Sequence, residues 1–531
     1  MLPILRLIML VCGVLALVCQ SPVVDAACAS RTRKSFDRLT ATERDTYVRA
    51  LQLAMDRGYY IKFVEMHMEK MSEMEAHRMC MFTYWHRYFL LGFENMLRSL
   101  GPEFQCVTIP YWDEIQHNAR AMSGSCSSIE SCSPIVAGLG GTSSGTVKGV
   151  TINGAYVSGG RCVNRPPLNK FCESSSKTGS ACARCLPRNS FQQKYFPPET
   201  NFASVYRQLF TAGNFVQTGK SLEEGMHNTF HSVLGSTMST MQSPADPLFW
   251  SHHAYVDLLF TIYLKCRVGL GQLSDAQKQN NPYTFVQCPR RDNTGFFTTS
   301  STVTMRNGEK GVNPKQASQP GQVLYPFFSN LPARFYQLSD ILRLTTGNSY
   351  TYSVSGLVAQ MATQCDSATG SRRLEEEVQP KNKNRHLKDC KSDLESGEAE
   401  QNKPHPGPFV VDHTDDNDES GGKVRAWVDD AREQLRATSN ATDYDHTGEV
   451  LELEKMVCVF YDQCRGGVQD YSEEFKKAFN VTGPPPCKRI VDELKANGIP
   501  VCAQMKLTDW RDTMEKYFPC ELPGDAYTTK S

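Results

Sequence analysis

The 531-residue chain has no excess of charge of either sign, since 57 lysines and arginines face 57 aspartates and glutamates. A uniformly basic or acidic surface of the kind that binds nucleic acid is therefore not expected, and a small-molecule substrate or a protein partner is. After residue 26 the chain also lacks any apolar run near the ~20 residues that a membrane span needs, so we expect no membrane span. Histidine is scarce, with twelve residues. The positions of those few histidines are therefore informative.

The first 26 residues have the pattern of a cleaved secretory signal. A single early charge, Arg6, precedes an apolar run over residues 7–18, and small residues follow up to Ala26. The alternative, a membrane anchor, is disfavoured because the run is short. We therefore predict a secreted protein.

Cysteine is plentiful in comparison with histidine. Of the 20 cysteines, two lie inside the predicted signal, and the remaining even number suits disulfides formed in an oxidising compartment. Cys182 and Cys185 form a CxxC pair, which in a cytosolic protein would suggest a redox or zinc site. Within the Ser/Gly/Cys-rich stretch of a secreted chain we interpret them as structural bridges, and Cys80 as a further disulfide partner.

The remaining sequence predicts a mainly helical protein with two folded regions. Helical patterning covers residues 36–101, returns at 221–235 with Ser221 as the expected N-cap, and resumes at Pro247 after Asp246. Low hydrophobicity between Cys365 and Lys423 predicts a charged linker. The predicted parts are the signal (1–26), a catalytic domain (27–365) with a Cys/Ser/Gly-rich insertion (114–200), the linker (366–423) and a small helical domain (424–531).

The histidines concentrate in two clusters, which suggests two metal positions because neutral imidazole is a preferred ligand of copper, zinc and iron. The first cluster is His67, His77 and His86, and the second is His227, His231, His252 and His253. His227 and His231 are four residues apart, so one helix face presents both. The zinc protease motif has glutamate after the first of such a pair, and Asn228 stands there instead, which excludes that interpretation.

Periodicity separates the two adjacent histidines of DPLFWSHHAYVD, residues 246–257. On a helix His253 shares a stripe with Phe249 and Asp257, whereas His252 points about 100° away. We therefore expect Asp257 to be a hydrogen-bonding partner of His253 and not of His252.

These segments resemble the copper signatures of the tyrosinase and haemocyanin family. HRMCMFTYWHRYFLLGFE (77–94) resembles the first signature, DPLFWSHHAYVD the second, HNTFH supplies the intervening pair, and TIPYWD (108–113) is a piece found in tyrosinases. The resemblance covers roughly residues 30–365. It implies a four-helix bundle around a dicopper centre, with a loop-rich, disulfide-containing periphery. The implied ligands are His67, His77 and His86 for one copper and His227, His231 and His253 for the other. His252 is then expected to be a neighbour near the substrate approach.

The same resemblance implies a secreted oxidase that uses dioxygen to convert monophenols to o-diphenols and o-diphenols to o-quinones. Proton acceptance from the phenol is assigned in such enzymes to a water held by Asn228 and a glutamate, for which Glu223 and Glu224 are the two candidates. The signature residues Glu94, Asp257 and Arg87 are expected in buried ion pairs. A catechol oxidase without the first step, and a haemocyanin-like oxygen carrier, remain the alternatives.

A separate motif lies in the C-terminal region. DYDHTGEVLELE, residues 443–454, resembles an EF-hand loop, although Leu451 departs from the usual polar residue at position nine. The alternative is an acidic helix start without metal. We predict an EF-hand-like helical domain that covers or regulates the copper site, with calcium held by Asp443, Asp445, Thr447, Glu449 and Glu454.

Overall fold

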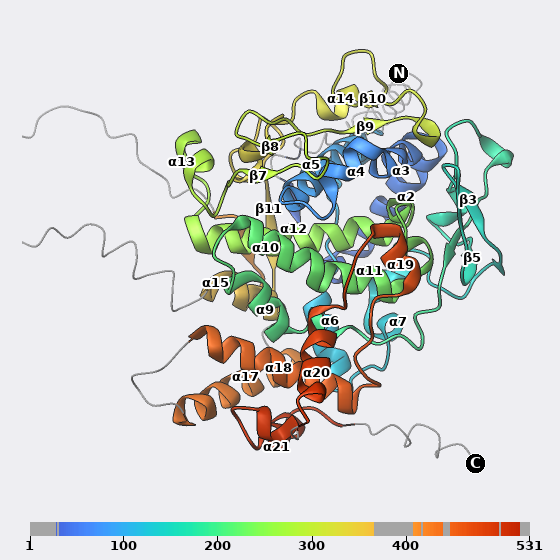
Figure 1. Ribbon diagram of the computed structural model, residues 1–531. Helices are drawn as coiled ribbons and strands as arrows, with labels where there is room; N and C mark the ends of the chain where they lie inside the picture. The colour runs from blue at the N-terminus through green and yellow to red at the C-terminus, as the bar shows by residue number, and fades with distance from the viewer. Residues whose placement is uncertain are drawn as a thin grey trace, which may run out of the picture.

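The computed structural model describes Cys28 and residues 31–365, 407–415, 418–438, 446–498 and 501–520, without the side chains of residues 502 and 503. The predicted signal and most of the predicted linker lie outside these residues. The described part is mainly helical with short strands (Figure 1), as predicted. Among these residues no helix combines the length and the apolarity that crossing a membrane requires.

The first helices form where the sequence predicted them. A capping box between Thr40 and Glu43 starts the first one, and Gly58, with φ of +73°, allows the chain to turn sharply into the next. These helices are α2 (Ala41–Asp56), α3 (Tyr59–Met68), α4 (Lys70–Ala76) and α5 (Phe82–Arg98).

The second half of the bundle differs from the expected single helix over 221–235. Helix α10 (Phe215–Leu222) begins earlier, capped by Asn214, so Ser221 is not an N-cap. A π-helical turn, η6 (Glu223–His227), with a non-helical Gly225, then connects it to α11 (Asn228–Leu234). Such π turns occur frequently at functional sites. Asp246 caps the long α12 (Pro247–Val268) as predicted.

The Cys/Ser/Gly-rich insertion is a mixture of short helices and strands around disulfides. Its elements are α6 (Glu114–Met122), α7 (Ile129–Cys132), α8 (Pro134–Gly138), β2 (Thr146–Val147), β3 (Val150–Ile152), β4 (Ala155–Val157), β5 (Arg161–Val163) and β6 (Leu186–Arg188). Cys182 bonds to Cys172 and Cys185 to Cys162, which confirms the structural interpretation of the CxxC pair.

The remaining segments of the first domain form further short helices and strands around the bundle. Its elements are α9 (Phe202–Phe210), α13 (Asp275–Asn280), β7 (Cys288–Pro289), β8 (Phe296–Phe297), β9 (Arg306–Asn307), β10 (Lys315–Gln316), α14 (Tyr325–Phe328), β11 (Tyr350–Val354) and α15 (Gly356–Gln364). Strand β11 lies between β1 (Arg31–Arg33) and β12 (Phe409–Val411), and both pairings are parallel. Strand β12 falls inside the range predicted as linker, so that part of the linker joins the fold of the first domain.

Buried ion pairs connect this sheet to the bundle. Glu94 pairs with Arg33 at 3.0 Å, and Arg33 also reaches Asp257 at 3.1 Å. Arg87 pairs with Asp257 at 2.5 Å. The expected ion-pair role of the signature residues is confirmed, and together they fix α5 against α12 beneath the histidines.

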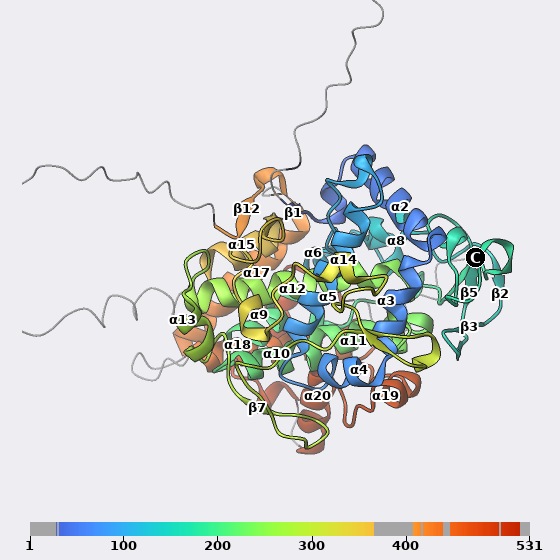
Figure 2. The ribbon, with the colours of Figure 1, turned by 90° about the horizontal axis from the view of Figure 1, so that it is seen from above.

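The C-terminal region is helical, as predicted. Its helices are α17 (Glu419–Thr438), α18 (His446–Cys464), α19 (Glu473–Phe479), α20 (Pro486–Ala496) and α21 (Trp510–Glu515). Most of its buried apolar side chains belong to the same core as those of the first domain, whereas Tyr471, Phe475 and Phe479 form a separate small cluster. In Figures 1 and 2, α19 lies apart from α17 and α21 and beside α11.

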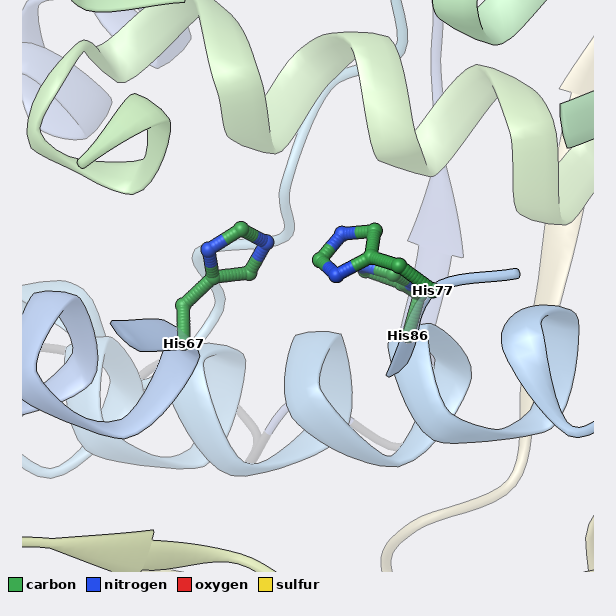
Figure 3. A group of neighbouring side chains, drawn as sticks. All are labelled: His67, His77 and His86. Atoms are coloured by element: carbon green, nitrogen blue, oxygen red, sulfur yellow. The ribbon is translucent and has the colours of Figure 1, made fainter. Parts of the chain in front are cut away.

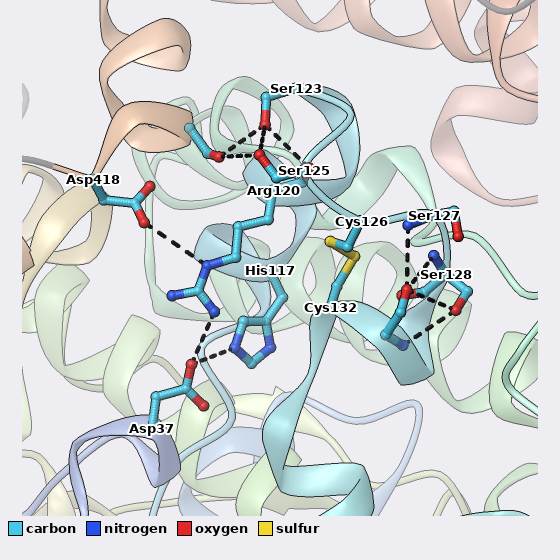
Figure 4. Close-up of a disulfide and its surroundings, with 12 residues drawn as sticks. Asp37, His117, Arg120, Ser123, Ser125, Cys126, Ser127, Ser128, Cys132 and Asp418 are labelled. Atoms are coloured by element: carbon cyan, nitrogen blue, oxygen red, sulfur yellow. Dashed lines mark hydrogen bonds and ion pairs between the residues drawn. A yellow bond between two sulfur atoms is a disulfide. The ribbon is translucent and has the colours of Figure 1, made fainter.

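Polar contacts also join the two regions at α6. Arg120 lies 3.0 Å from Asp37 and 3.9 Å from Asp418, which directly precedes α17 (Figure 4). His117 contacts the same Asp37 carboxylate at 2.9 Å. The Cys126–Cys132 disulfide closes the loop that follows α6. The C-terminal helices are thus packed on the first domain through both apolar and charged contacts.

Candidate metal centre

Three histidines from three different helices meet in the first cluster. His67 lies in the last turn of α3, His77 is the C-cap of α4, and His86 lies on α5. The ring centroids of His67 and His77 are 4.7 Å apart, and those of His77 and His86 are 5.3 Å apart. Each ring offers a nitrogen within 4.8 Å of the nitrogens of the other two. Figure 3 shows the rings turned toward one another, so the predicted first triad is brought together.

The second cluster contains four histidines. The ring centroids of His227 and His231 are 4.6 Å apart, as their spacing predicted. By mutual nitrogen distances within 4.8 Å, the third member of their triad is His252. His253 is also close, because its Nε2 lies 3.4 Å from Nε2 of His231. Its ring stacks on that of His86 at 4.2 Å and therefore connects the two clusters.

Hydrogen bonds fix which ring nitrogen faces the centre. Nδ1 donates to a carbonyl oxygen in His67 (Met241, 2.8 Å), His86 (Phe82, 2.9 Å) and His231 (Met238, 2.6 Å), and to the side-chain amide oxygen of Asn228 in His227 (2.9 Å). A donating Nδ1 leaves the lone pair on Nε2, as in metal-bound histidines. The Nε2 atoms of His67, His86 and His227 are buried and have no hydrogen-bond partner in the described structure.

The histidine rings of both clusters are buried and neutral. Burial is the main cause that lowers the pKa of each ring, to about 4 for His67 and to about 3 for His252. For His77, His86, His227, His231 and His253 burial and neighbouring imidazoles hold the pKa well below its ordinary value. Leaving several buried imidazole nitrogens without a partner costs free energy, and a bound metal ion would remove that cost. Converging neutral imidazoles are a donor set that suits copper.

His252 has a partner that its sequence position did not reveal. Its Nδ1 lies 2.5 Å from Oε1 of Glu114, and both side chains are fully buried. Burial raises the pKa of Glu114 well above its ordinary value. Nε2 of His252, like that of His67, His86 and His227, is buried and has no hydrogen-bond partner in the described structure. His252 is buried in the core and does not line an open approach for substrate.

The expected partnership between His253 and Asp257 is wrong. The carboxylate of Asp257 is occupied by Arg87, Arg33 and the hydroxyls of Tyr350 and Tyr352. Nδ1 of His253 has no hydrogen-bond partner in the described structure. Helical periodicity placed His253 and Asp257 on the same face of α12. The nearby arginines nevertheless bind the carboxylate, because a charged guanidinium binds it more strongly than a neutral imidazole does.

Glu223 and Glu224 differ in their surroundings. Glu223 is buried and its Oε1 accepts a hydrogen bond from the backbone N–H of Arg78 at 2.5 Å. Burial raises the pKa of Glu223 to about 8. The side chain of Glu224 is 46% exposed and lies 3.7 Å from Lys220. Both glutamates and Asn228 line one cavity of about 720 Å³ next to the second cluster.

A residue that the sequence analysis did not single out covers the histidines. Phe479, at the end of α19, is buried, and its ring centroid lies 5.2 Å from that of His77 and 6.1 Å from that of His231. It packs on Phe475 at 4.6 Å. The amphipathic pattern EEFKKAF predicts a helix there, but no local signal identifies the surface on which that helix packs.

The residues of the expected calcium loop are arranged differently from an EF-hand. Helix α18 begins at His446, so the predicted ligands Thr447, Glu449 and Glu454 are helical. Glu449 pairs with Arg432 at 2.8 Å, and Glu454 pairs with Arg207 of α9 at 2.6 Å. The other predicted ligands, Asp443 and Asp445, lie outside the described residues.

Two clusters of buried histidines in the middle of a helical bundle have the donor set of a paired metal site. Comparison with known proteins identifies the family. The sequence model of the common central domain of tyrosinase matches residues 57–265. The tyrosinase of Streptomyces glaucescens is 30% identical over 262 residues, which are 46% of this chain and 86% of that protein. The tyrosinase of Streptomyces galbus is 30% identical over 253 residues, 45% of this chain and 85% of that protein.

The chain belongs to the tyrosinase family of copper oxidoreductases. Among solved structures, a polyphenol oxidase variant from Thermothelomyces thermophila covers 61% of this chain and 88% of its own, at 17% identity and a TM-score of 0.38. That score is too low to support a conclusion about function. The match to the family's central domain ends before the C-terminal region, which contributes Phe479 to the site.

Proposed function

We propose that the chain is a secreted tyrosinase that oxidises monophenols to o-diphenols and o-diphenols to o-quinones at a coupled dicopper site. One observation carries the proposal: two clusters of buried imidazoles, one with His67, His77 and His86 and one with His227, His231, His252 and His253, are connected by the stacked rings of His86 and His253 at 4.2 Å. Copper bound there would supply dioxygen binding and the redox chemistry, and the protein supplies the geometry and a water-poor site.

For the second copper we assign His227, His231 and His253 as ligands. Two imidazole nitrogens that share one small ion in a tetrahedral arrangement lie about 3.3 Å apart, given metal–nitrogen bonds of roughly 2.0–2.1 Å. The 3.4 Å between the Nε2 atoms of His231 and His253 fits this value. The hydrogen bond between His252 and Glu114 supports a positioning role for His252.

Asn228 is proposed to serve the proton transfer of the monophenol step. Its amide oxygen accepts from Nδ1 of His227 and its N–H₂ group also contacts the hydroxyl of Tyr471, so one N–H remains to hold a water in the adjacent cavity. Glu223 is the better of the two candidate glutamates to share that water, because it is buried whereas Glu224 pairs with Lys220 at the surface. A water held by an amide and a carboxyl group is placed to accept the phenol proton as the oxygen approaches the metals.

The experiment compares L-tyrosine and L-DOPA as substrates of the copper-loaded chain and of Asn228→Leu. We expect both substrates to form quinone with the parent protein. The variant should lose monophenol turnover by roughly 10²-fold, the usual range for a positioned proton acceptor, with a much smaller loss on the diphenol. Glu224→Gln serves as the control and should leave the ratio unchanged.

The alternatives give different outcomes in the same experiment. Turnover of L-DOPA alone would make the protein a catechol oxidase. Turnover of neither, with reversible dioxygen binding, would make it an oxygen carrier, for which the cover provided by Phe479 is the supporting feature, since dioxygen is much smaller than a phenol. An equal loss on both substrates in Asn228→Leu would contradict the role of Asn228.

Secretion is part of the proposal. Support comes from eight disulfides within the described residues, among them Cys80–Cys288 and Cys266–Cys365, which a reducing cytosol would not maintain. Calcium binding at residues 443–454 stays a prediction. Titration calorimetry of the full chain tests it, and an absence of calcium binding at millimolar concentration, or binding unaffected by Glu454→Gln, would contradict it.

A further inference from the structure

The cavity beside the second histidine cluster has a wall from each region of the chain. It holds about 720 Å³, within the range of small-molecule sites. Asn228 and Glu223 are buried residues that line it, and residues 480–484, which follow α19, line it as well.

The cavity wall carries five cationic side chains and only two carboxylates. The cations are Arg78, Lys220, Arg290, Arg291 and Arg489, and the carboxylates are Glu223 and Glu224. Fixed charge of one sign in a concave site concentrates ligands of the opposite sign.

Ion pairs outside the cavity neutralise some of these cations. Arg290 lies 3.4 Å from Glu75. Arg78 and Arg291 both pair with the single carboxylate of Glu73, and the distance between Arg78 and Glu73 is 3.5 Å. Glu73 can neutralise only one of these two positive charges.

Arg489 is the least compensated of the cations. It lies in the first turn of α20, lines the cavity, and its side chain is exposed. No hydrogen bond or ion pair of its guanidinium is found within the described residues. Its neighbour Lys488 pairs with Asp492 on the same helix and does not line the cavity.

The cationic wall is held in place covalently. The disulfide between Cys80 and Cys288 joins the segment that follows His77 to the loop that carries Arg290 and Arg291, and both of its cysteines line the cavity. The charges of this loop are therefore fixed relative to the histidines.

We propose that this cavity selects phenols that carry a carboxylate, with Arg489 and the Arg78–Arg291 pair binding the acid group while the phenol ring points toward Asn228. The phenolic part of this ligand rests on the proposed function. A guanidinium pairs well with a carboxylate, because two parallel N–H donors match its two oxygens.

The test measures binding to the copper-free full-length chain by titration calorimetry, so that it does not depend on oxidase activity. The probes are para-hydroxyphenylpropanoate, para-ethylphenol and tyramine, which share the phenol ring and differ in charge. We expect the anion to bind most tightly and tyramine most weakly, with the difference shrinking as salt is raised. Arg489→Gln should weaken binding of the anion by roughly three- to tenfold, the size of one partly exposed charged hydrogen bond, and leave para-ethylphenol unchanged.

Lys488→Gln is the matched control, because it removes one positive charge from the same helix at a residue outside the cavity. Equal affinities for the three probes, or equal losses of anion affinity in the two variants, would overturn the proposal. Failure of the oxidase assignment would leave the binding order intact, whereas failure of this inference would leave phenol oxidation intact without a preference for acids.

Discussion

Removing the Phe479 ring should open the histidine clusters to phenols. The ring packs against His77 at 5.2 Å and His231 at 6.1 Å and occupies space in front of both proposed copper positions. Truncating a buried Phe to Ala costs about 3–5 kcal/mol. If this loss fell entirely on the docking of α19, the undocked fraction would rise by a factor between roughly 10² and 4 × 10³, since about 1.4 kcal/mol is a factor of ten.

Other contacts of α19 remain in the Phe479→Ala variant, so the expected gain is smaller. The backbone N–H of Ser472 donates to Ser232 at 2.7 Å, and the hydroxyl of Ser239 donates to Glu474 at 3.1 Å. We therefore expect L-DOPA turnover by the copper-loaded full-length chain to increase by at least about tenfold, partly through undocking and partly through the space left by the ring.

The assay follows quinone formation at equal copper content. Phe518→Ala is the control, because Phe518 is equally buried in the C-terminal region and packs on Trp427 and Phe460, away from the histidines. Unchanged or lower turnover in Phe479→Ala with the fold intact, or equal activation by Phe518→Ala, would refute the idea that this ring covers the site.

Three further predictions concern the centre and its support. His253→Ala should reduce bound copper from two ions per chain to one, whereas His252→Ala should retain two, as metal analysis would show; the opposite result would exchange their roles. In copper-free protein the raised pKa of Glu223, about 8, means that the folded state prefers the protonated acid, so the melting temperature should fall as pH rises from about 7 to about 8, above the range in which the buried histidines oppose this trend; Glu223→Gln should reduce the fall, and an unchanged fall would contradict this account. Asp257→Asn should lower the free energy of unfolding by about 3–5 kcal/mol in urea titration because it leaves buried arginines unpaired, and Asp45→Asn at the exposed pair with Arg49 should change it by less than about 1 kcal/mol; similar losses would contradict this account.

The sequence predicted the histidine clusters because their spacing is local. Four-residue spacing placed His227 and His231 together, and helix start signals located α12 from Asp246. It did not predict the π turn at Glu223–His227, since that turn depends on how Gly225 packs rather than on any strong breaker such as proline.

Long-range contacts explain the remaining differences. Glu114 and His252 are 138 residues apart, and the hydrogen bond between them follows only from the folded position of α6. The same holds for β12, whose pairing with β11 is not visible in a short segment surrounded by polar sequence. Phe479 reached the site because a whole region docks there, which no local pattern encodes.

Copper stoichiometry combined with turnover tests the central claim most directly. The full-length chain is loaded with copper, freed of excess metal and analysed for copper per chain, and L-DOPA oxidation is then measured on the same sample with the Phe479→Ala variant beside it. The account predicts two copper ions per chain, loss of one ion in His86→Ala, and quinone formation that increases in the Phe479→Ala variant. One copper or none per chain, or two copper ions without diphenol oxidation even in the variant, would contradict it.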